Sequence, residues 1–386
     1  MKKVTYRLLI TLFLLMIIGG CGANDPKKMQ TAGEHQTYRS TIDAKKQIDW
    51  ETSITVSAIG DMLIHAPVYR DAKTEDGYDF TPMLEKVKPY LQDATVTIAN
   101  QETMIGGEEL GLSSYPQFNS PFAVGDALKE AGVDVVTLAN NHTLDRGEVA
   151  VQRAISHWEA IDMMYTGAYK SEADQERIRV QETEAGISLA YLSYTYGTNG
   201  IPTPSGKDYL VNRIDREQIA GDMAKAKDMA DAVIVSLHFG TENERMPNVE
   251  QKDLAQYVSD LGANVIIGHH PHVLQPLEWL TGKHGNKTLV AYSLGNFLSS
   301  QKEYYQRIGG MLQFTLTKTG QGDNVEVTVE APTFLPTYMS YDNYADYQVL
   351  PLFNLPNGEL AGATKEYRDI KAHLSQWMPE LRFIEG

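Results

Sequence analysis

Three of the ten histidines of this 386-residue chain lie within four residues, in the sequence Gly-His-His-Pro-His at residues 268–272. Imidazole is the commonest protein ligand for transition metals. His270 and His272 are two residues apart, and residues i and i+2 of an extended segment share one face. A strand that ends at Gly268 can therefore direct both imidazoles at one metal ion. The alternative is a polar loop that contains histidines by chance, and each further candidate ligand counts against it.

Further oxygen and nitrogen ligands follow other apolar runs that are typical of buried strands. Functional groups in α/β proteins gather where strands end and loops begin, so we expect these side chains to meet at one edge. The candidates are Asp61 and His65 after residues 54–60, Asn100 and Glu102 after 94–99, Asn140, Asn141, His142 and Asp145 after 133–139, His238 after 232–237, His269 after 263–267, and Asn296 after 288–293. One further apolar run, residues 187–193, is predicted as a strand without a candidate ligand.

Each candidate taken alone has a purely structural explanation. Asp61 follows a glycine and could cap a turn or a helix. Asn140 and Asn141 could form a turn with left-handed backbone. Glu102 could be a solvated loop charge, and His238 could be a hydrogen-bonded histidine at the edge of the core. The joint pattern favours a site, because consecutive strand–helix units would each end in a potential ligand.

The mixture of Asp, Glu, Asn and His ligands suits a divalent ion such as Mn²⁺, Fe²⁺ or Zn²⁺. With six or seven such groups, the site could hold one ion, or two ions about 3.5–4 Å apart. Two ions could bridge a water molecule, lower its pKa and bind a phosphoryl or carbonyl oxygen. A histidine that binds no metal, such as His142, could protonate a leaving group or hydrogen-bond to an oxyanion. The candidate catalytic residues are His142 and Asp145.

The elements that position these residues alternate between strands and helices. Helical spacing of apolar residues predicts helices over residues 122–131, 147–160, 214–229, 249–261 and 364–377. Residues 310–316 and 325–331 are predicted as β segments joined by a hairpin around 319–323. This order of elements predicts an α/β fold with a largely parallel or mixed sheet in layers.

The composition is that of a globular protein with a sizeable core, since 42% of the residues are hydrophobic and 22% are charged. The formal net charge is −16. So acidic a chain is a poor partner for nucleic acid, whose phosphates need Lys and Arg. It is equally unsuited to loose electrostatic binding to anionic lipid.

The N-terminus is typical of a secretory signal over residues 1–20, with a basic start, an apolar run at residues 8–18 and then small residues. The run is too short to span a membrane comfortably. Residues 18–21, Ile-Gly-Gly-Cys, resemble a bacterial lipobox, in which Cys21 would carry the lipid. We therefore expect a lipoprotein anchored at the outer face of the cell membrane, with residues 21–50 as its lipidated cysteine and tether. The alternative is a free cysteine in an ordinary signal peptide.

Six segments of the chain, in this order, resemble the CapA or PgsA family of bacterial capsule-synthesis proteins, which act in poly-γ-glutamate biosynthesis. The resemblance covers about residues 53–300. The segments are Gly60–Asp61, Asn100–Glu102, Leu138–Asp145, His238–Gly240, Gly268–Pro276 and Tyr292–Phe297.

That family is similar in turn to calcineurin-like metallophosphoesterases, and this resemblance implies a fold and a ligand set. The implied fold is a layered α/β/β/α sandwich over residues 51–336, with a small C-terminal extension, residues 337–386, packed on it. The metal ligands implied are Asp61, Glu102, Asn141, His238, His270 and His272, with His142 at the catalytic or phosphate-contacting position. His65, Asn100, Asn140, His269 and Asn296 are candidates for supporting these ligands or contacting substrate.

Three positions depart from the patterns of these families. The sequence Asp-Met-Leu at residues 61–63 lacks the histidine of the usual Asp-x-His. Glu102 stands where the phosphoesterases usually have Asp, and Phe239 stands where CapA proteins commonly have Trp. Two of these departures therefore concern the expected metal ligands themselves.

The resemblance implies a metal-dependent hydrolase of the cell envelope that cleaves a phosphoester or a γ-glutamyl amide during capsule synthesis or export. The implied partners are membrane-bound subunits that synthesise and export poly-γ-glutamate, with that anionic polymer or a phosphorylated envelope compound as substrate. A non-catalytic subunit that binds polymer or organises the complex would carry the same motifs. A solute-binding lipoprotein is a third alternative, which would bind its ligand without metal.

Overall fold

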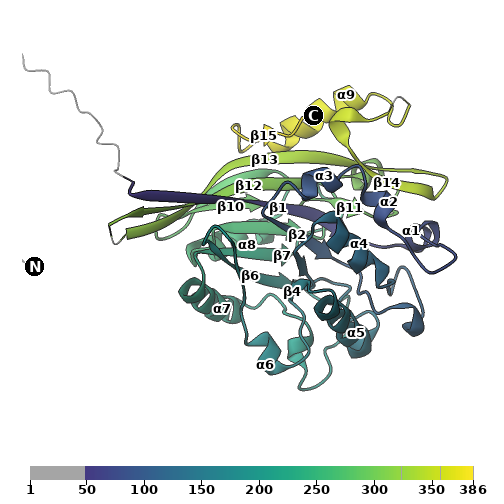
Figure 1. Cartoon of the computed structure of the whole chain (residues 1–386), viewed down its shortest axis with the longest axis horizontal. Coiled ribbons are helices and arrows are strands. Elements are labelled where there is room, and N and C mark those ends of the chain that lie inside the picture. The colour runs from purple at the N-terminus through teal and green to yellow at the C-terminus, as the bar shows by residue number, and fades with distance from the viewer. Residues whose placement is uncertain (1–47, 323, 357, 386) are drawn as a thin grey trace, which may run out of the picture. The chain divides into compact units, whose positions relative to one another are not determined.

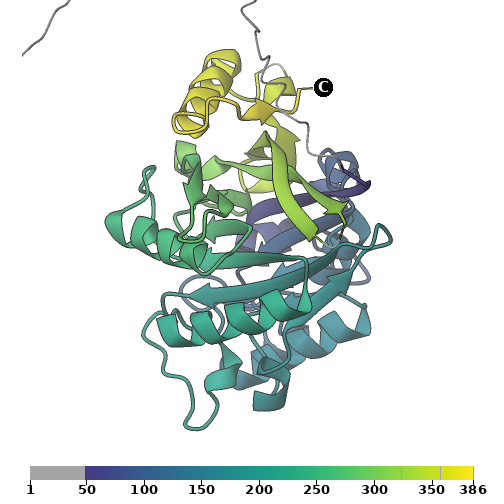
Figure 2. The ribbon, with the colours of Figure 1, turned by 90° about the vertical axis from the view of Figure 1, so that its left-hand side faces the viewer.

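The structure, a computed structural model, describes residues 48–322, 324–356 and 358–385. The predicted signal peptide, Cys21 and nearly all of the predicted tether lie outside the described residues. Between Trp50 and Phe383, strands and helices build two β-sheets that pack face to face (Figure 1, Figure 2). Helices cover the outer face of each sheet, so the structure confirms the expected layered α/β/β/α architecture.

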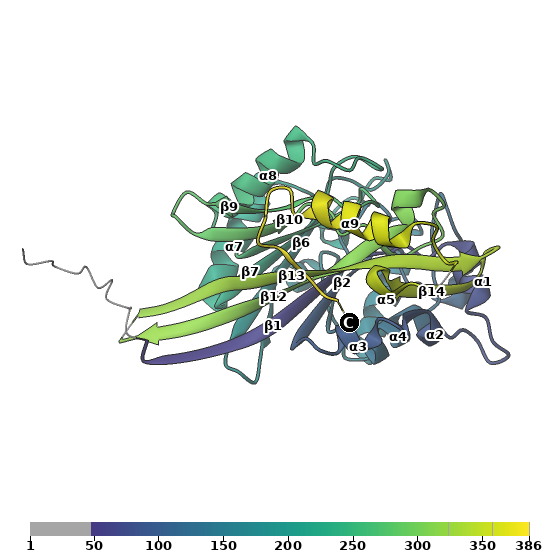
Figure 3. The same cartoon turned by 90° about the horizontal axis from the view of Figure 1, so that it is seen from above.

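The larger sheet has the strand order β14-β13-β12-β1-β2-β3-β4, with β11 beside β1 and β15 beside β13. Strands β1 to β4 are parallel to one another, whereas the pairs β1–β12, β12–β13 and β13–β14 are antiparallel. Figure 3 shows the three long strands β1, β12 and β13 side by side. The strands are β1 Trp50–Met62, β2 Val96–Gln101, β3 Val135–Thr137, β4 Met164–Thr166, β11 Asn296–Leu298, β12 Ile308–Gln321, β13 Asn324–Asp342, β14 Ala345–Pro351 and β15 Arg382–Phe383.

The smaller sheet has the order β5-β6-β7-β8-β10-β9, and β6, β7, β8 and β10 are parallel. Its strands are β5 Arg179–Glu182, β6 Ser188–Thr195, β7 Ala232–His238, β8 Val265–His269, β9 Leu277–Thr281 and β10 Lys287–Ala291. The α-helices are α1 Ala66–Asp71, α2 Thr81–Leu84, α3 Lys88–Leu91, α4 Ala123–Ala131, α5 Gly147–Ala160, α6 Glu172–Gln175, α7 Arg216–Met229, α8 Val249–Asp260 and α9 Ala363–Leu374. Short 3₁₀ turns lie at Glu108–Leu110, Asp208–Leu210, Tyr304–Arg307 and Leu352–Asn354.

The layers follow from the period of two in the strands, because successive side chains point to opposite faces of a sheet. In β7, Ile234 faces the core between the two sheets, whereas Val233 and Val235 face the core beneath α7 and α8. In β2, Ile98 faces the core between the sheets and Ala99 faces the helices α4 and α5. Both faces of these strands are apolar, as expected for parallel strands buried between layers.

The C-terminal part differs from the expectation that an extension begins after residue 336. β13 runs through Pro336 without interruption, and β14 pairs with residues 337–342. Residues 337–351 therefore belong to the larger sheet, because residues 337 and 338 still pair with β12 and the hairpin of β13 and β14 continues that sheet. The rest of the segment does pack on the domain, since Ile370 and Leu374 of α9 join the core between the sheets. None of the helices among the described residues is both long enough and apolar enough to cross a membrane.

Candidate metal centre

The predicted ligands come from both sheets and meet where the carboxyl ends of the parallel strands come together. Asp61 lies near the end of β1 and Glu102 directly follows β2, both in the larger sheet. His238 ends β7 and His269 ends β8 in the smaller sheet. The hydroxyl of Ser236 donates to the hydroxyl of Thr137 across the two sheets, at 3.4 Å, close to this edge.

The Gly-His-His-Pro-His loop has an unusual backbone that turns its imidazoles toward the larger sheet. His270 and His272 have φ angles of 97° and 59°, in the left-handed region that favours glycine. Gly268 must be glycine for a different reason, because a Cβ atom there would lie 1.9 Å from the carbonyl oxygen of Tyr292. Such backbone strain persists only where the surrounding structure enforces it, and it clusters at functional sites.

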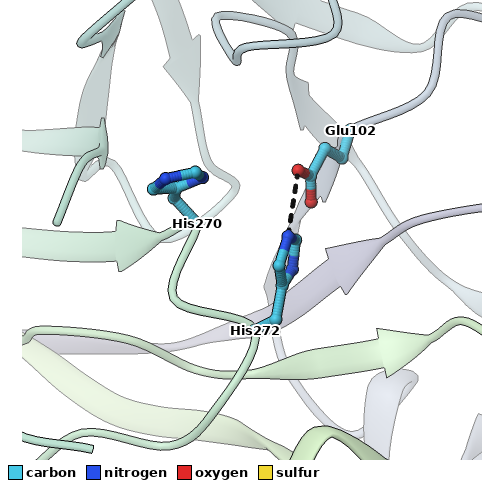
Figure 4. Close-up of side chains that lie close together, drawn as sticks. All are labelled: Glu102, His270 and His272. Atoms are coloured by element: carbon cyan, nitrogen blue, oxygen red, sulfur yellow. Dashed lines mark ion pairs between the residues drawn. The ribbon is translucent and has the colours of Figure 1, made fainter. Parts of the chain in front are cut away.

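Glu102, His270 and His272 form one compact group of potential metal ligands (Figure 4). One ligand atom from each of the three residues lies within 4.8 Å of the others, and all three side chains are buried. The Nε2 atom of His272 lies 3.7 Å from Oε1 of Glu102, which is the ion pair drawn in Figure 4. Among the described residues, this is the one group of three or more His, Cys, Asp or Glu side chains whose ligand atoms lie close enough together to share an ion.

The other predicted ligands continue this group on both sides. Oδ2 of Asp61 lies 3.2 Å from Nδ1 of His272. Nε2 of His238 lies 3.6 Å from Oε1 of Glu102 and 2.9 Å from Oδ1 of Asn141. All six predicted ligand side chains are buried and lie in one continuous cluster.

The cluster contains several polar atoms that are buried and without a hydrogen-bond partner among the described residues. These atoms are both carboxylate oxygens of Glu102 and the Nδ1 atoms of His238 and His270. Buried polar groups in proteins are nearly always hydrogen-bonded, so four such atoms in one cluster need an explanation. Oxygen and imidazole nitrogen donors of this kind fit a borderline divalent ion. The residues present therefore fit a divalent metal ion of the kind that the sequence predicted.

Burial and neighbouring charges raise the pKa of some groups in the cluster and lower the pKa of others. Burial lowers the pKa of His238 well below its usual value and, with the charge of His272, lowers the pKa of His270 to about 3. Both imidazoles are therefore neutral, the form that binds metals. Burial acts to lower the pKa of His272, but the carboxylates of Glu102 and Asp61 raise it to about 9. Burial raises the pKa of Glu102 well above its usual value, whereas hydrogen bonds from histidines outweigh burial and hold the pKa of Asp61 well below its own.

Three further predicted residues hold the ligands in place through hydrogen bonds. The Nδ2 amide of Asn100 donates to Oδ1 of Asp61 at 2.8 Å, and Nδ1 of His269 lies 3.0 Å from the same oxygen. Oδ1 of Asn296 lies 3.1 Å from Nδ1 of His272. Partners of this kind orient metal ligands and tune the properties of the metal.

His142 and Asp145 form a buried pair beside the cluster. Nδ1 of His142 lies 2.7 Å from Oδ2 of Asp145, and the same oxygen accepts a 2.7 Å hydrogen bond from the backbone N–H of Phe118. The ring of Phe118 packs edge-on against His142 and also against His65, with ring centroids 4.7 and 5.2 Å apart. Asn140 accepts a hydrogen bond from the backbone N–H of His142, so it shapes the turn and is not in the ligand cluster itself.

Sequence reasoning missed the loop that follows β6. The ring of Tyr196 lies over those of His270 and His238, with centroid distances of 4.6 and 6.4 Å. The side chain of Asn199 lies 3.3 Å from the amide of Asn141 and 3.4 Å from Nδ1 of His142. It therefore connects the cluster of potential metal ligands to the His142–Asp145 pair. The end of the predicted strand 187–193 was the available signal, because candidate ligands were assigned after the six other predicted strands between residues 54 and 293 but not after this one.

Comparisons with protein families and curated proteins find relatives of this chain. The model of the family described as bacterial capsule synthesis protein PGA_cap matches residues 55–301. The PGA biosynthesis protein CapA of Bacillus subtilis (strain 168) is 33% identical over 208 residues, which are 52% of this chain and 51% of that protein. The capsule biosynthesis protein CapA of Bacillus anthracis is 28% identical over 309 residues, which are 77% of this chain and 72% of that protein. The match thus spans about half the length of the Bacillus subtilis relative.

Solved structures with a related arrangement include the calcineurin-like phosphoesterase YfkN from Bacillus subtilis. Its similarity has a TM-score of 0.41 and 16% identity, and covers 73% of this chain and 91% of that chain. A putative 5'-nucleotidase from Staphylococcus aureus has a TM-score of 0.41 and 14% identity, over 82% of this chain and 58% of that chain.

Proposed function

The chain belongs to the bacterial capsule synthesis protein family PGA_cap, and from this premise we propose that it acts in capsule biosynthesis as a divalent-metal-dependent hydrolase. The proposed reaction is hydrolysis of a phosphoester or a γ-glutamyl amide. One observation carries the proposal. The buried group of Glu102, His270 and His272, with its unpartnered ligand atoms, lies beside a buried His142–Asp145 pair.

The residues that would hold an ion are the six buried side chains of the cluster, with Glu102 at their centre. Bound there, a divalent ion would lower the pKa of a water molecule and polarise a phosphoryl or carbonyl oxygen. Asn100, His269 and Asn296 fix the orientations of Asp61 and His272 through the hydrogen bonds described above. The protein therefore supplies an ordered set of ligands before any substrate arrives.

His142 is the proposed general acid. Its Nδ1–H donates to Asp145, so its Nε2 atom is left to carry a proton to the leaving group. The described residues give this Nε2 atom no hydrogen-bond partner. Asp145 is itself held by the backbone N–H of Phe118, so the imidazole is fixed in one tautomer and one orientation.

The proposal extends to location and partners. We place the protein at the outer face of the cell membrane, anchored through a lipid on Cys21, beside membrane-bound subunits that synthesise and export poly-γ-glutamate. The test is fractionation of cells that express the full chain or its Cys21→Ser variant. We expect the native chain in the membrane fraction and the variant outside it, and equal distribution of both would refute the anchor.

Activity is tested on the full chain purified in detergent and supplied with Mn²⁺ or Zn²⁺. The substrates are p-nitrophenyl phosphate and poly-γ-glutamate. We expect metal-dependent turnover that His270→Ala abolishes, whereas His284→Ala, an exposed histidine on another loop, leaves it unchanged. Metal-loaded protein that binds the polymer without any turnover would support a non-catalytic subunit instead. Ligand binding that is insensitive to chelator would support a solute-binding protein.

A further inference from the structure

A cavity of about 390 Å³ adjoins the metal centre and is not used by the proposed chemistry. It lies among the loop after β6, the loop after β7 and the first turns of α7 and α8, elements that cover one side of the smaller sheet (Figure 1). Its volume is in the range of sites that hold small ligands. The residues that matter for its chemistry are Tyr196, Arg216, Phe239, Glu250, Asp253 and Leu254.

Tyr196 is the wall that the cavity shares with the metal centre. One side of its ring lies against the imidazoles of His270 and His238, and its plane is within 8° of parallel to that of His238. The side chain is 49% exposed, although every imidazole beneath it is buried. A substrate that extends from the metal centre into the cavity would therefore contact the exposed part of this ring.

The lining has a mixed chemistry. Leu254 and Phe239 supply apolar surface, and Arg216 is the cation among the residues that line the cavity. The guanidinium of Arg216 pairs with Asp253, but these side chains are 48% and 69% exposed, and so exposed a pair contributes little stability. Breaking this pair therefore costs little, and the exposed Asp253 can be solvated when a ligand carboxylate takes its place beside Arg216. Glu250 remains as an acceptor for N–H groups.

We propose that this cavity binds the carboxylate-bearing aliphatic residue of the substrate next to the bond that is cleaved. The substrate carboxylate pairs with Arg216, its methylene groups lie on Tyr196 and Leu254, and its amide N–H faces Glu250. The inference rests on the proposed function and deepens it, because such a group belongs to an acylated amino acid such as a γ-glutamyl residue. It favours amide hydrolysis over cleavage of a simple phosphoester.

The test is binding of a short γ-linked glutamate oligomer to the Mn²⁺-loaded full chain, measured by calorimetry. We expect Arg216→Gln to weaken binding by about tenfold or more, because a charge-assisted hydrogen bond to the carboxylate is lost. Lys225→Gln removes the same charge from an exposed position further along α7 and should bind like the native chain. Tyr196→Ala should also weaken binding, whereas Tyr196→Phe keeps the ring and should retain most of it. Thermal unfolding of each variant verifies that the fold is intact.

Two outcomes separate this inference from the proposed function. If Arg216→Gln and Tyr196→Ala bind the oligomer as tightly as Lys225→Gln does, the cavity is not the binding site, even if metal-dependent hydrolysis is observed. If binding is weakened as expected but no substrate is turned over, the cavity assignment stands and the hydrolase proposal fails.

Discussion

The Nδ1 atom of His142 lies 2.7 Å from Oδ2 of Asp145, and the backbone N–H of Phe118 donates to the same oxygen at 2.7 Å. One carboxylate oxygen of Asp145 thus connects the imidazole to the loop that holds Phe118, which is 27 residues from Asp145 in sequence. The second oxygen of Asp145 is buried and has no hydrogen-bond partner among the described residues. The pair therefore fixes the Nδ1 atom of the imidazole, whereas the Nε2 atom remains available.

Asp145→Asn should therefore impair turnover more than it impairs metal binding. An amide at this position no longer enforces the Nδ1–H tautomer, so we expect kcat to fall by about 10²-fold or more. The measurement is steady-state hydrolysis across a pH series, with Mn²⁺ affinity determined on the same samples. Asp126→Asn is the matched control, because Asp126 holds the surface His157 at 2.9 Å in a similar pair. Unchanged kcat in Asp145→Asn would remove His142 from the role of general acid.

Glu102→Gln should separate metal binding from stability. The Glu102 carboxylate is fully buried and accepts no hydrogen bond from the described residues, so its charge costs the folded state free energy. His272 keeps its contact with Asp61 in the variant. We expect metal-free Glu102→Gln to be at least as stable as the native chain.

Added Mn²⁺ should stabilise the native chain by about 2.7 kcal/mol when the free ion is at 100 times its dissociation constant. Glu102→Gln should gain much less, and Glu108→Gln, an exposed residue after the same strand, should gain as much as the native chain. Thermal unfolding with and without Mn²⁺ measures both effects. A large loss of stability in the metal-free variant would show that the carboxylate serves the fold instead.

Gly268→Ala should destabilise the fold strongly. The added methyl would lie 1.9 Å from the carbonyl oxygen of Tyr292, so β8 would have to move away from the segment after β10. We expect a loss of about 3 kcal/mol or more in the free energy of unfolding, measured by urea titration. Gly221→Ala is the control, because Gly221 lies within α7 with open space around it and should gain about 0.5–1 kcal/mol.

Stability at acid pH should depend on the buried pair of Asp174 and Arg179, whose Oδ1 and Nη2 atoms lie 2.7 Å apart. Burial acts to raise the pKa of Asp174, but the backbone N–H of Lys170 and the Arg179 guanidinium outweigh it and hold the pKa below its usual value. A carboxyl with a lowered folded pKa contributes stability above its unfolded pKa of about 3.9 and loses it as the pH falls through the folded value.

Asp174→Asn should therefore cost about 3–5 kcal/mol at neutral pH, because it leaves the buried charge of Arg179 without its carboxylate. The difference from the native chain should shrink as the pH falls below about 4. Urea unfolding at several pH values measures this, with the exposed Asp228→Asn on α7 as control. A difference that stays constant down to acid pH would assign the cost to packing and not to charge.

Helices and strands were predictable where the apolar residues of a segment repeat with a single clear period. The helix expected at residues 147–160 has those same bounds, because Val151, Ala154, Ile155 and Trp158 repeat at helical spacing and form its buried face. The strand expected at 232–237 extends by one residue, to His238. Short strands such as β4, β5 and β9 were not predicted, because three to five residues carry too little pattern to identify them.

The sequence by itself determined which side chains stand at the strand ends, because strand periodicity and motif spacing are local properties. That parallel strands bring their carboxyl ends to one edge made the gathering of Asp61, Glu102 and His238 foreseeable. Only the tertiary structure decided what surrounds them. Tyr196 covers His270, and Asn199 reaches His142 across 57 residues of sequence. Such contacts arise from how the two sheets and their loops pack. Packing between distant segments produces no repeating pattern in the sequence, so the sequence alone does not reveal it.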